Sequence, residues 1–279
     1  MATSYIDLSG RCQIRPISEA DFERLALPRL PSDAVVWVYQ NPSPMGIGGL
    51  LRVPGKPMEA DVFLLMEADT SFEHDGARMM RFLLEQAHHL RLKRLVAVCS
   101  STQGNYARFL SKLGFRHAYE EWDMWRQLPH TFQIPEHRLV TLPEGEGASL
   151  ILKLYTETFS DEPWYLPYTN ATHLLDDFGI NSDLLFLYVE NKPVGFAGVR
   201  YSEEGSAEIE IIGLIKGYQS SYLEQSLMHA LLHHIIVVVN CNEVSLSVWR
   251  RNVNAITLAE SFGFYRIQSR TYLDLNLAV

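Results

Sequence analysis

The sequence lacks the features that mark several classes of protein. Its three cysteines, Cys12, Cys99 and Cys241, are scattered without CxxC spacing, so we expect a reducing compartment and no disulfide framework. Basic residues are fewer than acidic ones, 24 against 33, and the net charge of −9 disfavours nucleic acid or an anionic membrane as the main partner. No signal-peptide pattern is visible at the N-terminus, and the longest apolar runs, such as 184–189, are only strand-sized. We therefore expect a cytoplasmic protein, and the oligomeric state is open.

Apolar residues make up 47% and charged residues 20% of the 279 residues, which is typical of a globular protein of about two domains. The most directional pattern is the segment 244–264. Apolar residues alternate with serines over 244–248, which predicts a half-buried strand. A helical pattern follows over 252–262, where Asn252 can cap the helix and Gly263 can end it.

The same pattern occurs earlier in the chain at a fixed distance. Corresponding anchors lie 149 residues apart, namely Tyr39 and Tyr188, Pro44 and Pro193, Gly46 and Gly195, Gly49 and Gly198, and Gly114 and Gly263. Several anchors at one offset and in one order indicate two copies of one fold. The proline-containing stretch 130–136 has little periodicity and predicts a linker. We therefore expect one domain over 1–130 and a second over 131–279.

Each half is predicted to run strand, helix, hairpin, strand, helix, strand, helix, strand. In the first half the initial helix is expected over 18–27, with Ser18 as its cap and Asp21 in a capping-box position. In the second half the central strand is expected over 208–215, followed by a long helix that ends near Val239. This order predicts an α/β (mixed α+β) fold, with a largely antiparallel sheet flanked by helices in each half.

Each half resembles a GNAT-superfamily N-acetyltransferase domain, and the chain as a whole resembles a tandem GNAT protein. The most specific part is N-x-x-A followed by G-F, carried by Asn252, Ala255, Gly263 and Phe264, together with the hairpin 192–198. The resemblance implies that acetyl-CoA is the co-substrate and that a small amine or peptide amino group is the acceptor. It also implies that the CoA thioester lies where two central strands separate. The pyrophosphate would lie on backbone N–H groups at a helix N-terminus, which is a favourable site for phosphate.

Carried over by position, the resemblance assigns cofactor binding to nine residues of the second half. They are Leu214, Ile215, Gln219, Ser220, Ser221, Tyr222, Leu223, Glu224 and Asn252. Gln219 fits the family pattern Q/R-x-x-G-x-G/A, whereas Tyr222 and Glu224 replace small residues. The corresponding loop of the first half, 71–76, keeps only Gly76 and carries two acids, so the first half is predicted to be a degenerate copy.

The resemblance also points to Glu208 as the catalytic base, because it lies eleven residues before Gln219, as in the histone-acetyltransferase branch of the family. Glu210 is expected on the same strand face. The alternative is that both carboxylates face solvent or pair with a cation. The tyrosine that often protonates the leaving thiolate is replaced by Ala259 in the second half and by Leu110 in the first.

Two further patterns have competing interpretations. The loop 159–168 is aromatic and acidic, which suits an amine acceptor, although a lid packed on the core is an alternative. His229 and His233 lie one helical turn apart but have no third ligand in sequence, so we expect no metal site. Two functions remain open: an acyl-CoA-dependent N-acyltransferase with its catalytic site in the second half, or an inactive GNAT-like ligand-binding or scaffold protein.

Overall fold

The computed structural model divides into two compact units, residues 1–120 with 270–279 (unit 1) and residues 121–269 (unit 2). The structure describes residues 5–6, 13–18, 21, 35–40, 44–53, 56, 58–66, 72–129, 132–141, 146–162, 165, 167–178, 182–202 and 204–277.

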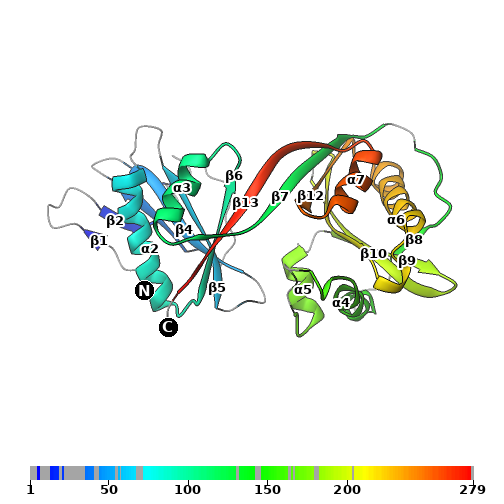
Figure 1. The fold of residues 1–279 in the computed structure, drawn as a ribbon, viewed down its shortest axis with the longest axis horizontal. Helices are drawn as coiled ribbons and strands as arrows, with labels where there is room; N and C mark the ends of the chain where they lie inside the picture. The colour runs from blue at the N-terminus through cyan, green and yellow to red at the C-terminus, as the bar shows by residue number, and fades with distance from the viewer. Residues whose placement is uncertain are drawn as a thin grey trace. The chain divides into compact units, whose positions relative to one another are not determined.

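Unit 1 is a mixed sheet with two described helices on one face (Figure 1). Its strands, in spatial order, are β1 (Tyr5–Ile6), β2 (Gln13–Pro16), β3 (Val35–Gln40), β4 (Pro44–Arg52), β5 (Glu59–Met66), β6 (Arg94–Ser100) and the end of β13 (Tyr265–Asn276). A π-helical segment, η1 (Phe72–Gly76), leads into α2 (Ala77–His89), and α3 (Gly104–Lys112) follows β6. The β5–β6 pair is parallel, and the other described pairs are antiparallel.

Unit 2 repeats this plan with helices on both faces (Figure 1). Its strands, in spatial order, are β8 (Leu139–Thr141), β9 (Ser182–Val189), β10 (Lys192–Tyr201), β11 (Ser206–Leu214), β12 (Glu243–Trp249) and the end of β7 (Arg116–Gln127). Its helical segments are α4 (Glu146–Phe159), α5 (Ala171–Phe178), η2 (Lys216–Tyr218), α6 (Ser221–His233), η3 (His234–Val239) and α7 (Val253–Ser261). The β11–β12 pair is parallel.

The last strand of each half belongs to the sheet of the other half. In unit 2, β7 pairs with β12, from Glu243 with Gln127 to Trp249 with Glu121. In unit 1, β13 pairs with β6, from Arg94 with Asn276 to Ser100 with Arg270. Corresponding residues of these two pairings again lie 149 positions apart, so the exchange is reciprocal. The compact units therefore differ from the expected ranges 1–130 and 131–279. The difference arises because each final strand forms its backbone hydrogen bonds with a strand of the other half.

The glycines shared by the two repeats leave room for a large neighbouring side chain, because they have no Cβ atom. A Cβ atom at Gly46 would lie 2.5 Å from Met66 Sδ, and one at Gly195 would lie 2.5 Å from Leu214 Cδ2. The two glycines therefore have the same role in β4 and β10, which explains why the repeat keeps both.

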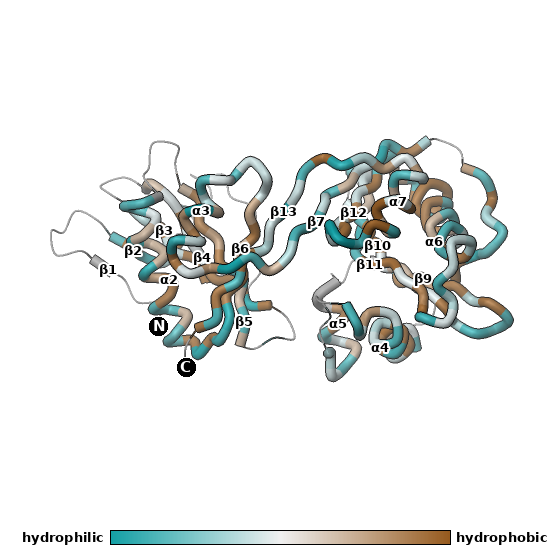
Figure 2. The backbone as a smooth tube through the Cα atoms, viewed as in Figure 1, coloured by the Kyte–Doolittle hydropathy of each residue, from teal (hydrophilic) through white to brown (hydrophobic). Residues whose placement is uncertain are grey.

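The helix α6 and the segment η3 form the apolar centre of one face of unit 2. Leu231, Leu232 and Ile235 are fully buried against the sheet, together with Ile256 and Ala259 of α7. Figure 2 shows the hydrophobic stretch along this helix. By length and composition it is the one described helix that could cross a membrane. In this stretch, Ser221–Val239, 39% of the residues are buried inside the structure.

The predicted order of elements and the mixed α/β class are confirmed in the described parts of both halves. The helix expected over 18–27 lies mostly outside the described residues. Within it, the Asp21 carboxylate accepts hydrogen bonds from the backbone N–H and the hydroxyl of Ser18, at 2.8 and 2.6 Å. This is the carboxylate half of the capping box.

Candidate functional site

The parallel pair at the centre of each unit separates part-way along its length. In unit 2 the pairing covers four residue pairs and stops at Ile209 and Leu246, although β11 continues to Leu214 and β12 to Trp249. In unit 1 the pairing of β5 and β6 covers three residue pairs and stops at Asp61 and Val96. Both units therefore have the diverging strands that the resemblance implies.

An irregularity in β11 brings two carboxylates to one cation. The β10–β11 register shifts between Gly198 and Val199, so Glu210 is an extra residue opposite the shift. Arg200 Nη2 lies 2.6 Å from Glu208 Oε2 and 2.7 Å from Glu210 Oε1. The two glutamates thus share one face, as expected, and they pair with a cation. Arg200 was not predicted, although it stands directly opposite Glu208 in the register.

The turn from β11 into α6 forms a capped helix N-terminus. Ser220 is the N-cap of α6, and its hydroxyl accepts a hydrogen bond from Leu223 N. Ser221 and Tyr222 are the first two helical residues, so their N–H groups have no intrahelical acceptor and are suited to an anion. The side chain of Gln219 turns back to donate to the Leu214 carbonyl at 3.4 Å.

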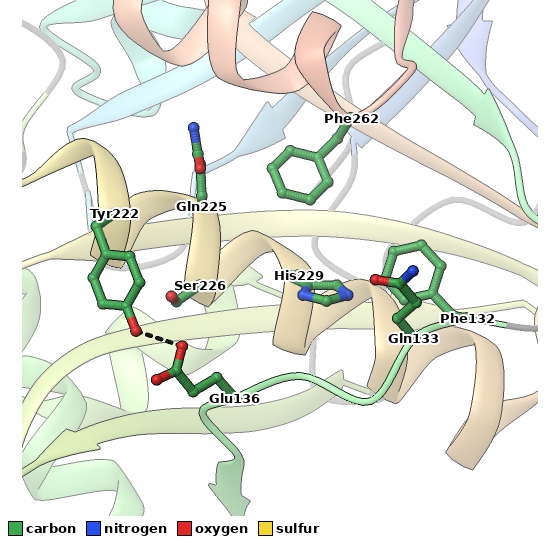
Figure 3. Close-up of a pocket in the computed structure, with 8 residues that line it drawn as sticks. All are labelled: Phe132, Gln133, Glu136, Tyr222, Gln225, Ser226, His229 and Phe262. Atoms are coloured by element: carbon green, nitrogen blue, oxygen red, sulfur yellow. Dashed lines mark hydrogen bonds between the residues drawn. The ribbon is translucent and has the colours of Figure 1, made fainter.

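The side chain of Tyr222 points away from this turn. Its hydroxyl donates to Glu136 Oε2 at 2.6 Å, and its ring lies edge-on to His137. Figure 3 shows Tyr222 reaching toward Glu136 along one face of α6. Tyr222 also lines a cavity of about 450 Å³ with Phe132, Gln225, Ser226, His229 and Phe262 among the other lining residues. The tyrosine that replaces a family glycine therefore presents only its backbone to the turn.

The remaining predicted cofactor residues lie in or near the same region of unit 2. Leu214 ends β11, and Ile215 N donates to the Val194 carbonyl. Glu224 lies in the first turn of α6, where its carboxylate competes with a bound anion for the positive end of the helix. Asn252 is the N-cap of α7, since its side-chain oxygen accepts from Ala255 N at 3.1 Å. The structure thus gives Asn252 a capping role.

One side chain distinguishes the two pairs of diverging strands. In unit 1, Tyr106 of α3 is 6% exposed, and its hydroxyl lies near the Leu64 backbone and the Cys99 thiol. Leu64 and Cys99 both lie beyond the last paired residues of β5 and β6, so Tyr106 packs near the part of the sheet where these strands diverge. Burial raises the pKa of the tyrosine. Ala255 occupies the corresponding position in unit 2, 149 residues later. The repeat offset could have revealed this difference from sequence alone.

The loop after α4 contacts both the core and the segment η2, which leads from β11 toward α6. Tyr165 and Tyr168 pack on the ring of Tyr155, each with centroids 5.4 Å away, which agrees with the lid interpretation of this loop. Asp161 accepts a hydrogen bond from Lys216 of η2. Trp164, part of the predicted aromatic loop, lies outside the described residues.

The two positions of the family tyrosine and the histidines of α6 lie in other surroundings. Ala259 and Leu110, which replace the family tyrosine, are 1% and 0% exposed, so both are core residues. Among the residues that the structure describes, no group of three or more His, Cys, Asp and Glu side chains is placed to hold a metal ion. His229 and His233 line two separate cavities.

Known proteins provide a comparison for this geometry. Residues 148–264 match the model of the acetyltransferase (GNAT) family. A probable spermine N(1)-acetyltransferase of Bacillus subtilis subsp. natto is 33% identical over 97 residues, and the chain spans 62% of its length. A GCN5-related N-acetyltransferase from Sphaerobacter thermophilus superposes with a TM-score of 0.69 at 15% identity, covering 92% of this chain and 84% of the other. A tandem GNAT protein from the clavulanic acid biosynthesis pathway also has a TM-score of 0.69, at 14% identity over 96% of this chain and 99% of its own.

Proposed function

We propose that unit 2 transfers an acetyl group from acetyl-CoA to a small amine or an amino terminus, because residues 148–264 match the model of the acetyltransferase (GNAT) family. Unit 1 is then a degenerate copy that completes the fold. The observation that carries this proposal is that the β11–β12 pairing stops at Ile209 and Leu246, with the small residue Ala255 at the position where unit 1 has the buried Tyr106.

The residues of unit 2 suit the CoA chain in several respects. The N–H groups of Ser221 and Tyr222 would bind the pyrophosphate at the N-terminus of α6. Leu214 and Ile215, at the end of β11, would border the pantetheine arm. Bound acetyl-CoA supplies an activated thioester, and the capped turns at Ser220 and Asn252 hold the helices α6 and α7 that border it.

Glu208 is the proposed proton acceptor for the attacking amine. Arg200 holds its Oε2 atom, which leaves Oε1 to take a proton directly or through a water molecule. The same pair of glutamates would attract a protonated amine to this face of β11. A polyamine is one acceptor to test, because the relatives at 32–33% identity are named as spermine or spermidine acetyltransferases. The protein would act in the cytoplasm.

The test of the activity is acetyl transfer to a panel of amines, with Glu208→Gln and Glu204→Gln compared. Glu204 lies in the turn before β11 and outside the proposed site. The proposal predicts that Glu208→Gln lowers kcat by about a hundredfold or more near neutral pH and leaves acetyl-CoA affinity unchanged. Transfer that is equal in both variants would remove Glu208 from the mechanism.

The second candidate is a GNAT-like binding protein without activity. It is favoured by the pairing of Glu208 with Arg200, by the acid Glu224 in the first turn of α6, and by the aliphatic residues in both tyrosine positions. Tight acetyl-CoA binding with no transfer to any amine would support this candidate over the enzyme.

A further inference from the structure

Unit 2 contains a second cavity, apart from the diverging strands, whose mouth is apolar. It has a volume of about 290 Å³ and lies between the segment 134–139 and the end of α6. Its apolar lining includes Ile134, Leu139 and Val238. Ile134 is 78% exposed and Val238 is 66% exposed, so large apolar side chains surround an open entrance. A volume near the lower end of the range of small-molecule sites, about 300–1,000 Å³, fits a small ligand.

Cationic and titratable groups converge on the same cavity. Arg138, His233 and His234 line it from two different segments of the chain. Burial lowers the pKa of His233, and the neighbouring His229, His234 and Arg138 lower it further. The protonated forms of these neighbouring groups repel one another. A bound anion would offset this repulsion, so the cavity favours an anion.

One lining histidine already has a carboxylate partner, and Glu136 is paired with a residue outside the cavity. Asp183 Oδ2 lies 2.8 Å from His234 Nε2 and accepts from the Tyr201 hydroxyl at 3.2 Å. Glu136 accepts from Tyr222. Within the described parts of the chain, Arg138 and His233 have no carboxylate partner, so the guanidinium charge of Arg138 remains available to a ligand and His233 can gain a proton when an anion binds.

We propose that this cavity binds an amphipathic monocarboxylate. The carboxylate lies on Arg138 and His233, and the aliphatic chain lies along Ile134, Leu139 and Val238. The site shares no residue with the proposed acetyl-CoA site, so it stands whether or not the protein is an enzyme. An inorganic anion would use the cationic groups but would gain nothing from the apolar walls.

The affinity should depend on pH with a defined sign. A carboxylate beside His233 favours its protonated form, so binding takes up a proton and strengthens as the pH falls through the histidine range. The groups that face His233 are His229 and His234 on the helix and Arg138 on the 134–139 segment, with Asp183 of β9 behind His234. We expect His233 to take up the proton when the carboxylate binds.

The test is calorimetric titration of sodium octanoate into the full chain at about pH 6 and about pH 7.5, where an unperturbed histidine changes charge. Arg138→Gln is expected to weaken octanoate by about tenfold or more, the loss of a charge-assisted hydrogen bond. The matched control is Arg116→Gln, an exposed arginine of unit 1, which should bind as the wild type does. Val238→Glu places a like charge at the exposed entrance without altering the core and should also weaken binding.

Three results would overturn the proposal. They are octanoate binding that is equal in Arg138→Gln and Arg116→Gln, octylamine binding as tightly as octanoate, and phosphate binding as tightly as octanoate. Octanoate binding that is stronger at the lower pH, and that loses this dependence in His233→Gln, would support it.

Discussion

The exchange of final strands between the two halves has a direct consequence for stability. Met124 lies in the first half of the sequence, but it is fully buried in unit 2, opposite Leu246. Leu273 lies in the second half, 149 residues later, and is 4% exposed in the core of unit 1. Truncating either residue should therefore destabilise the unit that the other half of the sequence mainly builds.

The magnitude follows from the burial. Replacing a fully buried methionine or leucine with alanine costs about 2–5 kcal/mol. The equilibrium constant for local opening of unit 2 should then be about thirtyfold or more larger in Met124→Ala, since 2 kcal/mol corresponds to about that factor in an equilibrium constant. Amide hydrogen exchange followed by mass spectrometry reports this opening for each segment separately.

The expected pattern is reciprocal. Met124→Ala should speed exchange in β12, α6 and α7, and Leu273→Ala should speed exchange in β6, α2 and α3. The reasoning would be refuted if Met124→Ala loosened α2 and α3 while α6 and α7 kept their protection. That result would mean that each final strand stays in the sheet of its own half.

Two further predictions concern individual buried groups. The Arg15 guanidinium, 2.6 Å from Asp21, and the Ser18 hydroxyl hold the pKa of Asp21 well below its usual range. The stability gained is therefore present at neutral pH and is lost as the pH falls below about 4. Asp21→Asn should cost about 3 kcal/mol near pH 7, and its melting temperature should approach that of the wild type in acid; a gap that stays constant with pH would contradict this. Burial raises the pKa of the Cys99 thiol to about 11, so Cys99 and Cys241, both buried, should react with iodoacetamide only on unfolding, and rapid labelling of the native protein would exclude this packing.

Much of the fold could be predicted from the sequence because its signals are local. The alternation over 244–248, the cap at Asn252 and the stop at Gly263 each depend on neighbouring residues, and all three occur in the structure as expected. The repeat offset also identified Gly46 and Gly195, whose close contacts are the same in both units.

The exchange of β7 and β13 could not be predicted in this way. Either half offers the same kind of sheet edge to either strand, so the choice depends on tertiary geometry that the local pattern does not contain. The site was predictable only where its signals are local in the sequence. The position of the α6 N-terminus follows from Ser220, whereas the pairing of Arg200 with Glu208 depends on cross-strand register.

The side chain of Tyr222 illustrates the limit of a motif. Tyr222 replaces a small residue of the family pattern, and its orientation toward Glu136 leaves the turn to the backbone. Orientation depends on the segment 132–137, which is remote in sequence from α6.

The central claim is that unit 2 binds acetyl-CoA between β11 and β12, and calorimetric titration with acetyl-CoA tests it most directly. The informative variant is Ala255→Tyr, which copies the side chain found at the equivalent position of unit 1, Tyr106. The control is Thr257→Tyr, the same addition at an exposed position of α7. We expect acetyl-CoA to bind to the wild type and to Thr257→Tyr, and binding to be lost in Ala255→Tyr with the melting temperature maintained. Equal binding by both variants, or no binding by the wild type at millimolar acetyl-CoA, would contradict it.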